Sequence, residues 1–241
     1  MSTSLAARLA DLVLATECAA CHRPGSRWCA RCDLALQRLE LAAQPVPVRP
    51  RPLPPLMPPT HAALAYADPV RAAVSAWKDA DRRDLVAVLG PVLERSVGAA
   101  VVAAGWGDAP VVVVPAPSSA GAARRRGDAP LLDLAEWVAR QPRHARMRVV
   151  PALRQVRRVA DQSGLTITER RRNLAGAMAV KPMWLNVIRD RNVVVVDDVV
   201  TTGATVAEAA RALRRAGAVR VVGAAVAAAQ RHERVSPVSR L

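Results

Sequence analysis

Aromatic side chains are scarce in this chain of 241 residues, which has no phenylalanine and a single tyrosine, Tyr66. The hydrophobic core must therefore be built from valine, leucine, alanine and the five tryptophans. The same scarcity argues against a surface dedicated to stacking the bases of single-stranded nucleic acid. Lysine is nearly absent too, with only Lys78 and Lys181 in a chain of formal net charge +15. This charge fits a polyanionic partner, such as nucleic acid or pyrophosphate, or a general bias towards Arg and Ala.

Long apolar runs are also missing, and no apolar stretch approaches a membrane span. The N-terminal stretch 5–14 is interrupted by Arg8 and Asp11, so it does not resemble a signal peptide, and we expect a short amphipathic helix there. We therefore predict no membrane insertion and a cytoplasmic protein.

Four cysteines lie close together as two CxxC pairs, Cys18 with Cys21 and Cys29 with Cys32. Two such pairs can bring four thiolates into one tetrahedral shell, which is the arrangement that structural zinc prefers. Disulfide-forming or reactive pairs are the alternative, which a reducing cytoplasm disfavours. We predict a closed zinc ribbon or knuckle. His22 directly follows Cys21 and reaches the metal poorly, so it is expected to lie outside the ligand set.

The most informative stretch is 193–205, which reads VVVVDDVVTTGAT. Four valines predict a strand buried on both faces of a parallel sheet, and the run stops at Asp197 and Asp198. A turn rich in hydroxyls and glycine follows, and then helical spacing up to Gly217. Backbone N–H groups at such a helix start bind phosphate, while carboxylates accept hydrogen bonds from vicinal hydroxyls. The pattern indicates a sugar phosphate ligand, with helix capping by Asp and Thr as the alternative.

This stretch resembles the phosphoribosyl pyrophosphate (PRPP) motif of type I phosphoribosyltransferases. The resemblance implies that Asp197 and Asp198 contact the ribose hydroxyls and that the turn wraps the 5′-phosphate. It also implies Mg²⁺ bound together with PRPP. The residues of the turn are Thr201, Thr202, Gly203, Ala204 and Thr205.

A second valine strand at 111–114 runs into Pro115, and this region resembles the pyrophosphate loop of the same transferases. Ser118, Ser119 and Arg126 are the expected pyrophosphate contacts, although an ordinary strand-ending turn and a solvated charge run are the alternatives. The basic segment 153–176 resembles the mobile loop that closes over the substrate and excludes water. Its expected contacts are Arg157, Gln162 and Arg170.

Taken in order, the double CxxC segment, VPAPSS, DQSGL…ERRRN…GA and VVVDDVVTTGAT resemble the ComF family over roughly residues 15–230. That resemblance implies a role in competence and DNA uptake, with single-stranded DNA and proteins of the competence machinery as further partners. The chain departs from the family pattern at 128–130, Val159 and Met178. These departures favour retained ligand binding over assured catalysis, so a possible phosphoribosyltransferase activity stays open.

The expected fold is α/β, a type I phosphoribosyltransferase-like parallel sheet flanked by helices with a small N-terminal Cys₄ zinc segment. We predict a helix and zinc segment at 1–44, a proline-rich linker at 45–59, a phosphoribosyltransferase-like domain at 60–230 and a tail at 231–241. The expected function is binding of PRPP or a related ribose 5-phosphate ligand. The alternative is a non-catalytic nucleotide or single-stranded DNA binding module on the same scaffold.

Overall fold

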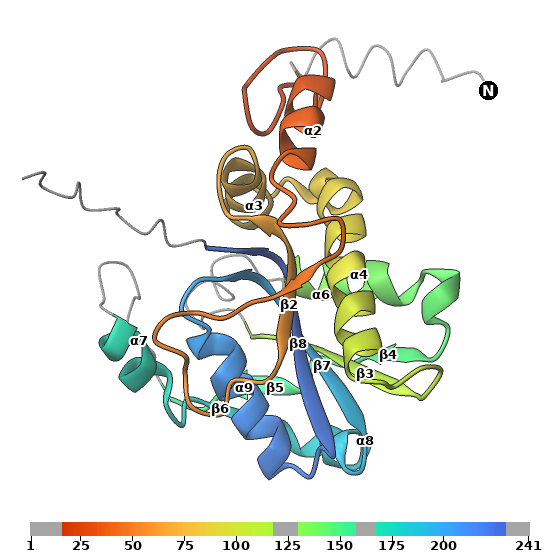
Figure 1. Cartoon of the computed structure of the whole chain (residues 1–241), viewed down its shortest axis with the longest axis vertical. Helices are drawn as coiled ribbons and strands as arrows, with labels where there is room; N and C mark the ends of the chain where they lie inside the picture. The colour runs from red at the N-terminus through yellow and green to blue at the C-terminus, as the bar shows by residue number, and fades with distance from the viewer. Residues whose placement is uncertain (1–15, 118–129, 158–166, 230–241) are drawn as a thin grey trace, which may run out of the picture.

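The computed structural model describes residues 16–117, 130–157 and 167–229 as a central sheet with helices on both faces (Figure 1). Its strands and helices alternate through most of the chain, which confirms the predicted α/β class. The strands are β1 (Val46–Pro47), β2 (Thr60–Ala65), β3 (Val111–Pro115), β4 (Met147–Val149), β5 (Leu153–Gln155), β6 (Met178–Val180), β7 (Asn192–Val200) and β8 (Arg220–Ala228). The α-helices are α2 (Ala30–Gln37), α3 (Val70–Asp79), α4 (Val86–Ala103), α6 (Pro130–Ala139), α7 (Ile167–Leu174), α8 (Leu185–Ile188) and α9 (Ala204–Arg215). Short 3₁₀ turns are η1 (Arg83–Leu85), η2 (Pro142–His144) and η3 (Pro182–Trp184).

Six strands form the main sheet in the order β1-β2-β8-β7-β3-β4. Only the β1–β2 pair is antiparallel, and β2, β8, β7, β3 and β4 run parallel to one another. The two valine strands lie side by side, with Val113 of β3 opposite Val194 of β7. Since parallel strands end at one edge, the segments after β2, β3, β7 and β8 all leave the sheet on the same side.

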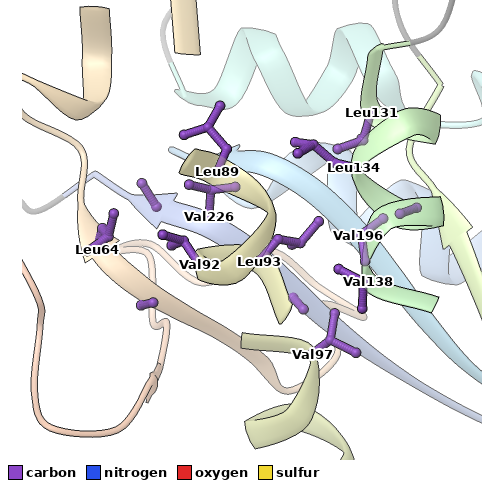
Figure 2. Close-up of a cluster of buried hydrophobic side chains, with 14 of the residues drawn as sticks. Leu64, Leu89, Val92, Leu93, Val97, Leu131, Leu134, Val138, Val196 and Val226 are labelled. Atoms are coloured by element: carbon purple, nitrogen blue, oxygen red, sulfur yellow. The ribbon is translucent and has the colours of Figure 1, made fainter. Parts of the chain in front are cut away.

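The core is divided between the two faces of the sheet, because alternate residues of a strand point to opposite sides. On one face α4 and α6 cover the sheet, as the side chains of Leu93, Leu134 and Val196 show in Figure 2. On the other face Val193 and Val195 pack with the alanines of α9 and with Leu213. The packing is dominated by Val, Leu and Ala, as the composition requires.

Helix α4 together with η1 is apolar enough to resemble a membrane span. Within the described residues, Arg83–Ala103 is long and apolar enough, by length and composition alone, to cross a membrane. Of its most apolar stretch, 56% is buried inside the protein. This helix therefore differs, by length and composition, from the prediction that no stretch approaches a membrane span. The helix packs on the sheet through Leu89, Val92 and Leu93 (Figure 2), which is typical of a core helix.

The proline-rich segment 45–59 lies against the sheet and α9. Val46 pairs with Ala62, so β1 adds an antiparallel edge strand beside β2. Further along, the guanidinium of Arg214 donates to the carbonyl oxygen of Leu56 at 2.7 Å. Figure 1 shows this orange segment passing α9 before it enters β2. The prolines keep it extended, and its contacts fasten it to the domain.

Two further parts of the chain complete the fold. The strands β5 and β6 form a separate antiparallel pair, with Leu153 opposite Val180. They flank the basic segment, whose described part contains α7. At the other end of the molecule, α2 and the cysteine segment lie near α3, beyond the edge where β2 ends (Figure 1). The predicted N-terminal helix at 5–14 and the tail at 231–241 lie outside the described residues.

Candidate functional site

The acidic pair lies inside β7. We expected the strand to stop at Asp197, but it continues through Asp197 and Asp198 to Val200 because one side stays paired with β8 as far as Ala228, whereas pairing with β3 on the other side ends at Val196. Asp197 and Asp198 are only 8% and 6% exposed. The backbone N–H of Asp198 donates to Oδ1 of Asp197 at 3.0 Å. The carboxyl groups are therefore held by regular sheet geometry at the carboxyl edge of the sheet.

Burial makes this pair electrostatically costly. Burial, and then the adjacent charge of Asp198, raise the pKa of Asp197 well above its ordinary value. Two neighbouring acids with this little exposure need a proton, a cation or ligand hydroxyl groups to be stable. A pair of this kind at the end of a parallel strand is typical of a binding site.

A cation that we did not predict meets the pair from α3. The Lys78 ammonium forms an ion pair with Oδ2 of Asp198, across a large separation in sequence. Burial alone would lower the pKa of Lys78, but the charges of Asp198 and Asp197 outweigh burial and raise it. One signal in the sequence could have identified this residue, namely that Lys78 is one of only two lysines among 35 basic side chains.

The turn after β7 places the predicted phosphate-binding residues at the start of α9. Thr201 is exposed and Thr202 half-buried, while Gly203 precedes the helix with φ of +72°. Ala204 is the first residue of α9, and its N–H donates to the hydroxyl of Thr202 at 3.4 Å. The next N–H groups of a helix have no partner within the helix, so they are available to an anion. Thr205 is half-buried in this first turn.

Gly203 is also covered from one side by the proline-rich segment. A Cβ atom added at Gly203 would lie 2.5 Å from Sδ of Met57 and 3.1 Å from Cγ of Pro50. The left-handed φ and this contact both favour glycine. The proline-rich segment thus forms one wall of the turn, which sequence reading did not anticipate.

The single tyrosine lies near the acidic pair. Tyr66 directly follows β2, and the Arg71 guanidinium lies over its ring, 5.7 Å from the centroid. Burial, and then the charge of Asp198, raise the pKa of Tyr66. Tyr66 and Lys78, both from the β2–α3 region, are therefore influenced by the charge of Asp198.

The remaining predicted contacts are only partly described. Ser118, Ser119, Arg126 and Gln162 lie outside the described residues, and so does the side chain of Arg170 in α7. The loop after β3 nevertheless begins beside the acidic pair, because the N–H of Ala116 donates to the carbonyl of Val196 at 2.9 Å. Arg157 donates to the carbonyl oxygens at the end of α7, the nearest being that of Ala175 at 2.8 Å. It therefore joins the two ends of the basic segment.

The four cysteines gather as predicted. The Sγ atoms of Cys18, Cys21, Cys29 and Cys32 all lie within 4.8 Å of one another, and every one but Cys21 is buried. Burial acts against ionisation of Cys18, but backbone N–H groups of Ala20, Cys21 and Cys29 outweigh it and lower its pKa to about 6. Burial, and then the neighbouring thiols, raise the pKa of Cys32. This donor set fits a metal ion such as zinc.

His22 and Arg82 show how this cysteine cluster is attached. His22 is exposed and lies 3.6 Å from the Glu17 carboxylate, in agreement with its predicted place outside the ligand set. Arg82, which follows α3, donates to the backbone carbonyls of Glu17 at 3.1 Å and Arg27 at 3.0 Å. Its Nε and Nη2 are held by Asp84. The cysteine cluster is therefore docked on the segment that follows the helix carrying Lys78.

Part of this chain is similar to a known family of domains. Residues 148–239 are similar to the phosphoribosyl transferase domain family. A search of curated proteins gave no match to this chain. The matched range includes β7, the acidic pair and the start of α9, and it excludes the cysteine cluster and Lys78. The chain therefore carries a phosphoribosyltransferase-like domain behind four cysteines that could hold a metal ion.

Proposed function

We propose that this protein binds PRPP, or a related 5-phosphoribosyl ligand, at the carboxyl edge of β7. The observation that carries the proposal is the buried pair Asp197–Asp198, followed at once by the Gly203 turn, inside the range similar to phosphoribosyltransferase domains. Vicinal ribose hydroxyls would add donors to those that the two carboxylates have in the described part of the chain, the Asp198 N–H and the Lys78 ammonium. The first N–H groups of α9 are suited to the 5′-phosphate.

Mg²⁺ fits this site as a companion of the ligand. Carboxylate and phosphate oxygens are the donors that Mg²⁺ prefers, and it is usually bound by one or two carboxylates together with substrate phosphates. Asp197 and Asp198 are the residues that would hold it. When bound, the ion would neutralise the pyrophosphate and so favour its departure from C1′.

The reaction class that follows from such a ligand is phosphoribosyl transfer. The bond between C1′ and the pyrophosphate oxygen would break, and an acceptor would form the new bond at C1′. The described residues contribute binding, orientation and charge, and the acceptor is not identified by them. We therefore propose ligand binding first and transfer second.

We further propose that the metal of the cysteine cluster is zinc and that the protein is ComF-like. Four Cys Sγ atoms with no further position open for substrate favour a structural ion. A ComF-like role in competence and DNA uptake, with single-stranded DNA and the competence machinery as partners in the cytoplasm, follows from the sequence resemblance and stays a prediction.

Titration calorimetry with PRPP and Mg²⁺ tests the proposed ligand. The doubly substituted Asp197→Asn/Asp198→Asn protein should bind at least about tenfold more weakly, because charge-assisted hydrogen bonds contribute about 1.5–3 kcal/mol each. Asp190→Asn is the matched control, since Asp190 is exposed near the opposite end of β7 and should leave affinity unchanged. Absence of PRPP binding by the unsubstituted protein would overturn the proposal.

A further inference from the structure

We propose that Lys78 is a second ligand-binding residue, which holds Asp198 and at the same time contacts the pyrophosphate of bound PRPP. This inference rests on the proposed function. It gives α3 a direct part in recognising the anionic leaving group, although α3 lies outside the range similar to phosphoribosyltransferase domains.

The first support is the balance of charge. Asp197 and Asp198 are two adjacent, buried acids, and Lys78 is the cation that forms an ion pair with them among the described residues. Burial and the charge of Asp198 raise the pKa of Asp197, and the Lys78 ammonium balances the charge of the Asp198 carboxylate. A ligand whose hydroxyl groups bind the acids leaves the lysine charge available for an anion.

The second support is the geometry of the ion pair. An ammonium group has three N–H donors, and the contact with Asp198 uses one of them. The Lys78 side chain is 38% exposed while that of Asp198 is 8% exposed, so the pair is open to solvent on the lysine side. The remaining donors can therefore meet a ligand oxygen without breaking the contact with Asp198. Pyrophosphate oxygens are the anionic acceptors nearest to the ribose hydroxyls in PRPP.

The third support is the choice of side chain. Of 35 basic residues only Lys78 and Lys181 are lysine, so this chain places arginine almost everywhere that a positive charge is needed. A planar guanidinium pairs side-on with one carboxylate, whereas a compact ammonium can serve two acceptors in different directions. A lysine at the acidic pair is thus explained by a bridging role and not by charge alone.

The experiment compares two ligands that differ only in the pyrophosphate. Affinities for PRPP and for ribose 5-phosphate are measured at one fixed Mg²⁺ concentration, the second by competition against PRPP. Lys78→Met should weaken the binding of PRPP at least about tenfold and the binding of ribose 5-phosphate less than about threefold, because only PRPP carries the pyrophosphate that Lys78 would contact. Lys78→Arg should restore only part of the loss. Lys181→Met replaces the other lysine and should change neither affinity.

Each outcome decides the inference. Equal weakening of both ligands would mean that Lys78 only neutralises Asp198, and unchanged affinities would mean that it has no part in binding; either result overturns the proposal. Full recovery by Lys78→Arg would overturn the bridging role. Thermal unfolding checks that the variants are folded, and Lys78→Arg, which keeps the charge, carries the comparison if Lys78→Met is unstable. If the unsubstituted protein does not bind PRPP, the proposed function itself fails, which is a different result.

Discussion

Two buried carboxylates on consecutive elements have pKa values displaced in opposite directions. On α9, burial alone would raise the pKa of Glu208, but Arg211 and the N–H of Met178 outweigh it and lower the pKa. Both oxygens of Glu208 are used, with Arg211 contacts at 2.7 Å and the Met178 N–H at 2.9 Å. On β7, burial and Asp198 raise the pKa of Asp197.

The two sites differ in how many of their carboxylate oxygens have a hydrogen-bond donor or cation from the described part of the chain. Glu208 finds all its donors within the chain and fastens α9 to β6, so its role is structural. Among the described residues, the pair Asp197–Asp198 has the Asp198 N–H and the Lys78 ammonium as partners, which leaves acceptor oxygens for a ligand. The four cysteines belong with the acidic pair, because four thiol groups, three of them buried, gather within 4.8 Å of one another and could hold a metal ion. Five predictions test this contrast.

The largest effect should follow from Cys21→Ser, because it removes a donor from an incomplete cluster that depends on its ion. Structural zinc contributes on the order of 10 kcal/mol to the folding of small modules. The segment 16–40 should lose its structure while the sheet stays folded, as hydrogen exchange would show. His22→Ala should keep the metal, because His22 is exposed and pairs with Glu17. Metal analysis that finds no zinc in reduced, chelator-free wild-type protein would contradict this prediction.

Glu208→Ala should be the most destabilising substitution in the complete cluster, by about 3 kcal/mol, because it leaves the Arg211 charge and the buried Met178 N–H without their acceptor. Urea unfolding measures the change. Glu136→Ala is the control: Glu136 forms an exposed ion pair with Arg140 at 2.6 Å, and its loss should change the free energy of unfolding by about 0.5 kcal/mol or less. Similar losses in both variants would erase the distinction between the clusters.

Gly203→Ala should destabilise the protein by about 2 kcal/mol, because φ at Gly203 is +72° and the added Cβ meets Met57. Adding Met57→Ala should recover part of this loss, because it removes the contact with the added Cβ. It should leave the backbone strain unchanged. Gly98→Ala in α4 should instead stabilise the protein. A Cβ atom added at Gly98 would meet no neighbour within 4 Å, and alanine favours a helix over glycine by about 0.5–1 kcal/mol. Equal stability of the Gly203 variant and wild type would show that the turn has no left-handed residue.

Asp197→Asn should raise the free energy of unfolding at neutral pH by about 1 kcal/mol, because it removes a carboxyl group whose ionisation is disfavoured by burial and by Asp198. The same substitution should weaken ligand binding. The amide oxygen can still accept the N–H of Asp198. Thermal unfolding of the ligand-free protein measures the gain. A loss of stability in this variant would mean that the acidic pair is a structural cluster like that of Glu208.

The smallest effect is a change of the free energy of unfolding with pH, which should have opposite signs for Glu208 and Asp197. The folded pKa of Glu208 is lowered from about 4.5, so its stabilisation is present above that pH and is lost as pH falls through the folded value. The folded pKa of Asp197 is raised above 3.8, so wild type loses stability as pH rises from that value through the folded pKa. Glu208→Gln should therefore be less stable than wild type at neutral pH and Asp197→Asn more stable. Both differences should shrink towards zero in acid, and curves that diverge in acid would contradict these assignments.

Much of the fold could be predicted from local patterns. The valines at 111–114 and 193–196 form adjacent buried strands, because unbroken apolar runs with β-branched side chains suit a sheet covered on both faces. The exact end of β7 was missed because two acids look like a strand terminus, whereas pairing with β8 carries the strand to Val200. The proline-rich segment looked like a connector, since composition indicates an extended chain but not the surface on which it lies.

The site divides in the same way. The sequence by itself determined the parts that lie within one short stretch: the two acids, the hydroxyl-rich turn with its glycine, and two CxxC pairs whose spacing brings four thiols together. Only the tertiary structure decided that Lys78 from α3 meets Asp198, that Met57 covers Gly203, and that Arg82 docks the cysteine cluster beside that helix. Local patterns report the preferences of neighbouring residues. Contacts between distant segments depend on how the β2–α3 region and the proline-rich segment pack on the completed sheet, which no single stretch encodes.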